Sequence, residues 1–184
     1  MDIASLTEQL SVWGANRVAV IPVTELVFDA EFRKACEVNS CGIYGRCWMC
    51  PPDVGEIHTL IKQAMRYQNA LVYQTVSPLE DSYDIEGMQL AAKRHVQLTL
   101  RFKRETMEDP CPHLHLAAGG CHVCEKCTKL EQLPCRFPEL ALPSLEAYGI
   151  NVSKMASAAG MKYINGANTV TYFGAMLYGT DESH

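Results

Sequence analysis

The chain has 184 residues, 48% of them hydrophobic, and a formal net charge of -5 at pH 7. This length and hydrophobic content suffice for a sizeable core without disulfides, so we expect a single domain over residues 1–184. The negative charge argues against nucleic acid as the main partner, because phosphate binding normally requires a basic surface. We see no secretory signal and no apolar run near the roughly 18 residues of a membrane span, and therefore expect a cytoplasmic protein with no membrane partner.

Helical and extended patterns alternate through the first part of the chain. Apolar residues at helical spacing predict a short amphipathic helix after Ser5 or Thr7, ended by Gly14. Alternating valines then predict a strand over residues 18–23. A loop is expected over residues 36–52, where glycines and paired prolines disfavour continuous helix.

The middle of the chain carries the longest predicted helix. It follows a helical stripe over residues 54–67 and a strand over residues 70–76, and covers residues 86–107. Its predicted inward face is apolar: Met88, Ala91, Ala92, Val96, Leu98 and Phe102. Its outer face is basic: Lys93, Arg94, Arg101 and Arg104, with Lys103 on the flank. A solvated helix surface is the ordinary explanation of such a face, and a docking patch for an acidic partner is the alternative.

Three further elements follow a predicted strand over residues 113–116. They are a short helix over residues 143–149, a second helix over residues 152–160 and a final strand over residues 169–178. The whole pattern predicts an α/β fold, a small sheet layered with helices. This fold carries two cysteine-rich loops, at about residues 36–52 and 119–138.

Eight of the nine cysteines form two groups of four. The first group is Cys36, Cys41, Cys47 and Cys50, and the second is Cys121, Cys124, Cys127 and Cys135. In a reducing cytosol, closely spaced cysteines are more often metal ligands or redox groups than structural disulfides. Four thiolates are the number that one metal centre requires, so the grouping predicts two centres.

The second group indicates iron and sulfide. A C-x2-C-x2-C run, as in Cys121, Cys124 and Cys127, wraps three corners of a 4Fe–4S cube, and a more distant cysteine completes the site. A zinc site usually draws on two separate C-x2-C hooks, whose four sulfurs lie about 2.3 Å from one ion. Cys135 is the simplest fourth ligand. Cys111 competes with it, although a buried free thiol is the more ordinary role for a lone cysteine.

The first group is less diagnostic, because its C-x4-C-x5-C-x2-C spacing suits zinc as well as iron. Gly42 and Gly45 would let backbone N–H groups approach the sulfurs, which is one control on cluster potential, or they serve only the turn. We favour two 4Fe–4S clusters, with zinc as the alternative and metal-free thiol chemistry third.

Other residues point less clearly to chemistry. Tyr44 and Trp48 would shield a centre or anchor the loop, and anchoring is the commoner role. His113 and His115 share one side of a strand, but structural roles are the ordinary ones for such histidines. We find no phosphate loop, G-x-S-x-G elbow or H-E-x-x-H helix, so a self-contained hydrolase or nucleotide-binding enzyme is poorly supported.

The cysteine segments also resemble a known family, the predicted metal-binding proteins grouped as domain of unknown function 2284. The resemblance spans residues 36–152. It lies in Cys41-Gly42-Ile43-Tyr44-Gly45 with Cys47 and Cys50-Pro51-Pro52, in Gly119-Gly120-Cys121-His122-Val123-Cys124 with Cys127, and in Cys135-Arg136-Phe137-Pro138 with the segment Pro143 to Val152. It implies a cysteine-ligated metal, with Fe–S favoured, and no settled activity. Cys36 and Cys135 match the family pattern, which favours them over Cys111, whereas Asn151 stands where the pattern tends to carry aspartate.

Three functions are compatible with these patterns. The first is electron transfer to or from a redox partner protein, with two cubes as a short relay and the basic helix face as the docking surface. The second is an enzyme or activating factor in which one cluster keeps an open coordination position for a substrate. The third is a zinc-stabilised binding module. The redox partner, the substrate, the cluster potential and the oligomeric state do not follow from the sequence.

Overall fold

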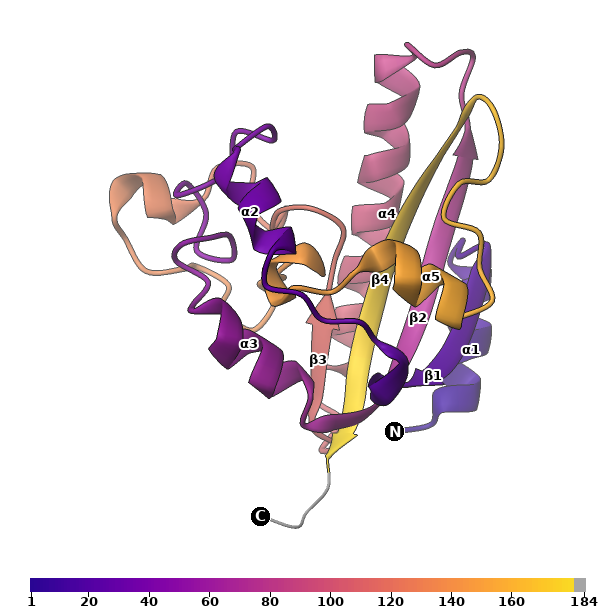
Figure 1. The fold of residues 1–184 in the computed structure, drawn as a ribbon, viewed down its shortest axis with the longest axis horizontal. Coiled ribbons are helices and arrows are strands. Elements are labelled where there is room, and N and C mark those ends of the chain that lie inside the picture. The colour runs from indigo at the N-terminus through magenta and orange to yellow at the C-terminus, as the bar shows by residue number, and fades with distance from the viewer. Residues whose placement is uncertain (181–184) are drawn as a thin grey trace.

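The computed structural model describes residues 1–180, and its centre is a four-stranded antiparallel sheet (Figure 1). The strands are β1 (Arg17–Pro22), β2 (Tyr67–Pro78), β3 (His113–Leu116) and β4 (Thr169–Thr180). They lie in the order β1-β2-β4-β3, and the two long strands pair in the middle, with Val72 opposite Ala175. All four strands occur where the sequence predicts them, and helices cover both faces, so the predicted α/β fold is confirmed.

One face of the sheet is covered by α1 (Ile3–Val12) and α4 (Ile85–Thr106). Side chains alternate between the faces along a strand, so Leu71 and Tyr73 of β2 point to this side. The core here also contains Leu6, Leu10, Leu98, Phe102 and Met176. Helix α1 begins earlier than predicted, because the Asp2 carboxylate accepts a hydrogen bond from the Ser5 backbone N–H at 3.0 Å and caps the first turn.

The opposite face is covered by α3 (Ile57–Ala64), α5 (Val152–Ala158) and the short 3-10 helices η1 (Val23–Glu25) and η3 (Glu146–Tyr148). Ala70 and Val72 of β2 point to this side. The predicted helix over residues 143–149 is only the η3 turn, and it ends at Gly149 with φ of 70°. Asn151 then begins α5, since its side chain accepts the Lys154 N–H at 3.0 Å. Aspartate would serve the same capping role, which accounts for either residue at this position.

The inward face of α4 is more polar than predicted. Its buried residues are Ala91, His95, Leu98, Thr99, Phe102 and Thr106, whereas Met88, Ala92 and Val96 are only half-buried. The polar members have partners in the sheet: Thr99 with the Tyr73 hydroxyl at 2.9 Å and His95 with Thr75 at 2.9 Å. Burial of these side chains is tolerated because they are hydrogen-bonded.

The outer face of α4 is exposed, as predicted, at Lys93, Arg94, Arg101 and Arg104. Lys103 is different. Its ammonium donates to the Ala141 carbonyl at 2.8 Å, and burial lowers its pKa. This flank of the helix therefore faces the protein rather than solvent.

Both cysteine segments lie in a lobe beside the sheet (Figure 1). The lobe contains α2 (Phe32–Glu37) and the 3-10 helix η2 (Thr128–Glu131). Cys36, expected in a loop, lies on α2, and the rest of the first group lies in turns. No helix within residues 1–180 is both long enough and apolar enough to cross a membrane.

Candidate metal centre

The two cysteine loops lie against each other. A Cβ atom on Gly120 would lie 3.0 Å from Ile43 Cδ1 and 3.5 Å from Cys50 Sγ. The backbone of the second loop therefore lies within van der Waals range of a thiol of the first loop, and a side chain at residue 120 would press on Ile43. The lobe is a single unit rather than two separate cysteine loops.

Two polar contacts also join the loops. The Trp48 indole N–H donates to the Leu133 carbonyl at 2.9 Å, and the Lys129 ammonium lies 4.3 Å from the centre of the Trp48 ring. The same ammonium forms an ion pair with Asp53, and both side chains are less than a fifth exposed. Trp48 is thus an anchor, as predicted, but it anchors one loop to the other rather than to the core. No spacing rule pairs Asp53 with Lys129, because these residues are far apart in the sequence.

Three thiols form a hydrogen-bonded chain across the loops: Cys121 donates to Cys47, and Cys47 donates to Cys50. The bond from Cys47 lowers the pKa of Cys50. The bond from Cys121 lowers the pKa of Cys47, but its own bond to Cys50 and burial outweigh that effect and raise the pKa to about 11. Donation to Cys47, followed by burial, raises the pKa of Cys121. Cys47 and Cys50 are 3% and 9% exposed, so both are buried where the two loops meet.

Backbone N–H groups donate to these sulfurs from neighbouring residues. Met49 donates to Cys47, Cys121 to Cys50, and both Val123 and Leu142 to Cys121. The glycines do not take this role: the Gly42 N–H donates to the Asn39 carbonyl at 3.0 Å and the Gly45 N–H to the Pro51 carbonyl at 2.8 Å. Their positive φ values, 70° and 68°, show that they serve the turns.

The cysteines line two main hollows and one small cavity. The first cavity, of about 210 Å³, is lined by Cys36, Cys41 and Cys50 together with Tyr44, Gly120 and Glu146. The second hollow is a groove of about 500 Å³, lined by Cys47, Cys121, Cys124 and Cys127. A smaller cavity of about 20 Å³ touches these four and adds Cys135. The thiol groups suit soft metals, including zinc and Fe–S clusters.

The two hollows group the cysteines differently from their spacing in the sequence. Cys47 belongs to the first group by spacing, yet it lines the groove of the second group. Cys111 lines neither hollow: it precedes β3, with its Sγ 3.8 Å from the Pro112 carbonyl, and it lies near Tyr67 and Tyr178. Within residues 1–180, no three or more His, Cys, Asp and Glu side chains gather as they would around one metal ion. The thiols instead stand along the walls of the hollows.

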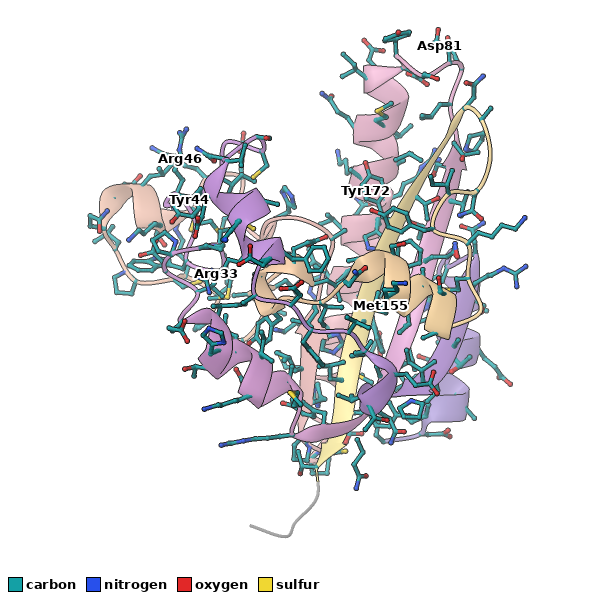
Figure 2. All side chains as sticks on the ribbon, viewed as in Figure 1. Arg33, Tyr44, Arg46, Asp81, Met155 and Tyr172 are labelled. Carbon is teal, nitrogen blue, oxygen red and sulfur yellow. The ribbon has the colours of Figure 1, made fainter. Side chains whose placement is uncertain are left out.

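Charged groups of opposite sign act on Cys36 at the first cavity. Burial raises the pKa of the Cys36 thiol, and the Glu146 carboxylate acts in the same direction. The Arg33 guanidinium opposes both, and this arginine is only 9% exposed. Figure 2 shows Arg33, Tyr44 and Arg46 on the lobe, and Arg46 also lines the groove of the second group.

The histidines of β3 have structural contacts. His115 is buried, pairs with the Thr106 hydroxyl at 2.8 Å and packs edge-on against Phe102. His113 pairs through Nδ1 with the Cys111 carbonyl at 2.7 Å. These contacts agree with the structural roles expected for both.

The fold and the thiol-lined lobe define a small cysteine-rich α/β protein. The sequence pattern of one family matches residues 19–178, most of the chain. The chain belongs to this family, DUF2284, whose members are described as predicted metal-binding proteins. No curated protein and no solved structure matches the chain.

Proposed function

We propose that this protein binds two 4Fe–4S clusters through its cysteines and transfers electrons to or from a redox partner protein. The observation that carries the proposal is the contact between the two cysteine loops, where thiols of both are joined by hydrogen bonds. Centres held on these loops would adjoin one another. Adjacent centres are what a short electron relay requires.

Iron is favoured over zinc by the chemistry of the donors. The C-x2-C-x2-C run suits three corners of a cube. Several backbone N–H groups donate to the sulfurs, and such hydrogen bonds tune cluster potential. Cavities of about 210 and 500 Å³ beside the thiols offer more room than a single ion needs.

The partner would dock on the exposed basic face of α4. The charge of this face contrasts with the chain's net charge of -5, so it is a local feature suited to an acidic partner. The same helix reaches the cysteine-bearing lobe on its flank, because Lys103 donates to the Ala141 carbonyl and lies close enough to Cys121 for the thiol to act on its pKa.

The test is the iron, acid-labile sulfide and zinc content of protein purified without oxygen, with visible spectra before and after dithionite. We expect about eight irons and eight sulfides per chain and a spectrum that bleaches on reduction. Colourless protein with bound zinc would overturn the proposal and leave a zinc-stabilised binding module. Cys111→Ser is the matched control, since Cys111 lines neither hollow and its loss should leave the iron content unchanged.

A further inference from the structure

We propose that the first centre is held by only three thiolates, Cys36, Cys41 and Cys50, and that its fourth metal position is open to a small oxygen-donor ligand from a neighbouring cavity. Cys47 then belongs to the second centre. This inference rests on the proposed function, since it assumes that the lobe binds Fe–S clusters.

The three-thiolate set follows from the walls of the first cavity. Among residues 1–180, the cysteines that line it are Cys36, Cys41 and Cys50. Its remaining polar lining includes Glu146, whose charge acts on Cys36. A cluster seated here would meet three sulfurs, and no fourth cysteine among residues 1–180 lines this cavity.

Cys47 is placed in the second centre by its position. It lines the same groove as Cys121, Cys124 and Cys127, and it is not among the residues that line the first cavity. Four cysteines around that groove are enough for a cube, whereas Cys135 reaches only the small cavity. The C-x2-C-x2-C run is thereby completed by a residue from the other loop.

A larger cavity adjoins the first cavity. Its volume is about 330 Å³, and it shares Gly119 and Glu146 with the first cavity. His95, Tyr163 and Tyr172 contribute polar groups to its walls. Figure 2 shows Tyr172 over β4, beside α4. The cavity therefore extends from the sheet to Gly119 and Glu146, the two residues that it shares with the first cavity.

His95 suits the binding of an uncharged ligand there. Its Nδ1 pairs with the Thr75 hydroxyl at 2.9 Å, which orients the ring. Its Nε2 has no hydrogen-bond partner of ordinary geometry within residues 1–180, although the Phe173 backbone lies near the ring. Burial lowers the pKa of His95 to about 4, which keeps the ring neutral at physiological pH, and a ligand hydroxyl or carbonyl at Nε2 would compete only with the Phe173 backbone.

An iron without a thiolate has two consequences. It takes a hard oxygen donor such as water, hydroxide or an alcohol, in the way that catalytic metal sites keep one position open. It is also lost on oxidation: a 4Fe–4S cluster of charge 2+ gives a 3Fe–4S cluster of charge 1+, one Fe²⁺ and one electron, which ferricyanide accepts to become ferrocyanide.

The first test uses the wild-type protein and needs no variant. Stepwise addition of ferricyanide to the anaerobic protein should release one iron per chain and produce the EPR signal of a three-iron cluster. Ferrous iron with dithionite should restore the fourth iron. In water enriched in the magnetic oxygen isotope, the reduced first centre should show a hyperfine coupling to oxygen. Iron that is fully retained, or an absent coupling, would overturn the open position.

The second test assigns Cys47. Cys47→Ser should lose the second centre and keep the first with its labile iron, whereas Cys135→Ser and the control Cys111→Ser should keep both. Loss of the second centre in Cys135→Ser but not in Cys47→Ser would refute the assignment. A wild-type protein with no iron and sulfide at all would instead refute the proposed function.

Discussion

The ion pair between Lys129 and Asp53 joins the two cysteine loops, and its removal should loosen the lobe. Lys129→Met keeps much of the side-chain length but removes the charge. It leaves the Asp53 carboxylate less than a fifth exposed and without its cation, and it removes the ammonium 4.3 Å from the Trp48 ring.

The expected cost can be estimated from these two contacts. A hydrogen bond to a charged group contributes roughly 1.5–3 kcal/mol, and a cation over an aromatic face roughly 0.5–2 kcal/mol. Both contacts keep some solvent exposure, which screens them, so we expect Lys129→Met to cost about 2 kcal/mol. The ion pair between Lys126 and Glu131 provides a matched control, because its side chains are 63% and 47% exposed. Lys126→Met should cost less than about 0.5 kcal/mol.

Urea unfolding measures the free energy of unfolding of both variants with and without bound metal. A chelator assay measures how fast the lobe releases its metal. Lys129→Met should unfold at lower urea and release metal faster than Lys126→Met. Equal effects of the two substitutions in both assays would refute the role of this ion pair in closing the lobe.

Three further predictions concern the sheet and its helix. Gly174→Ala places a Cβ atom 2.3 Å from the Tyr73 ring, which is fully buried, so thermal denaturation should show a loss of about 3 kcal/mol. Burial lowers the pKa of His95 from its ordinary 6.5 to about 4 in the folded protein, so the unfolded chain binds a proton first as pH falls. Stability should therefore decrease by up to about 3 kcal/mol between pH 6.5 and 4, and His95→Gln should show a smaller decrease in urea titrations at each pH. Lys103→Met removes a half-buried cation near Cys121. If Cys121 ligates a cluster, the reduction potential of that cluster should fall in a redox titration. An unchanged potential would exclude electrostatic tuning by Lys103.

Much of the fold follows from local patterns. The strand pattern at residues 169–178 and the helical stripe at residues 86–107 predict β4 and α4 to within a few residues, because apolar periodicity reports the face that each element buries. The same patterns were incomplete at the inward face of α4. The apolar stripe does not include His95 and Thr99, yet both are buried, because partners on β2 satisfy their hydrogen bonds.

Cysteine spacing predicts that the chain binds metal and which loops carry the ligands, since only residues close in sequence can be grouped by their spacing. How those ligands are divided depends on the tertiary structure. The packing of Gly120 against Cys50, and the bond from Cys121 to Cys47, bring the two loops together and place Cys47 on the groove of the second group. Contacts between distant loops carry no periodic signal along the chain, so the sequence determined the chemistry of the donors, and the folded lobe decided which hollow each donor lines.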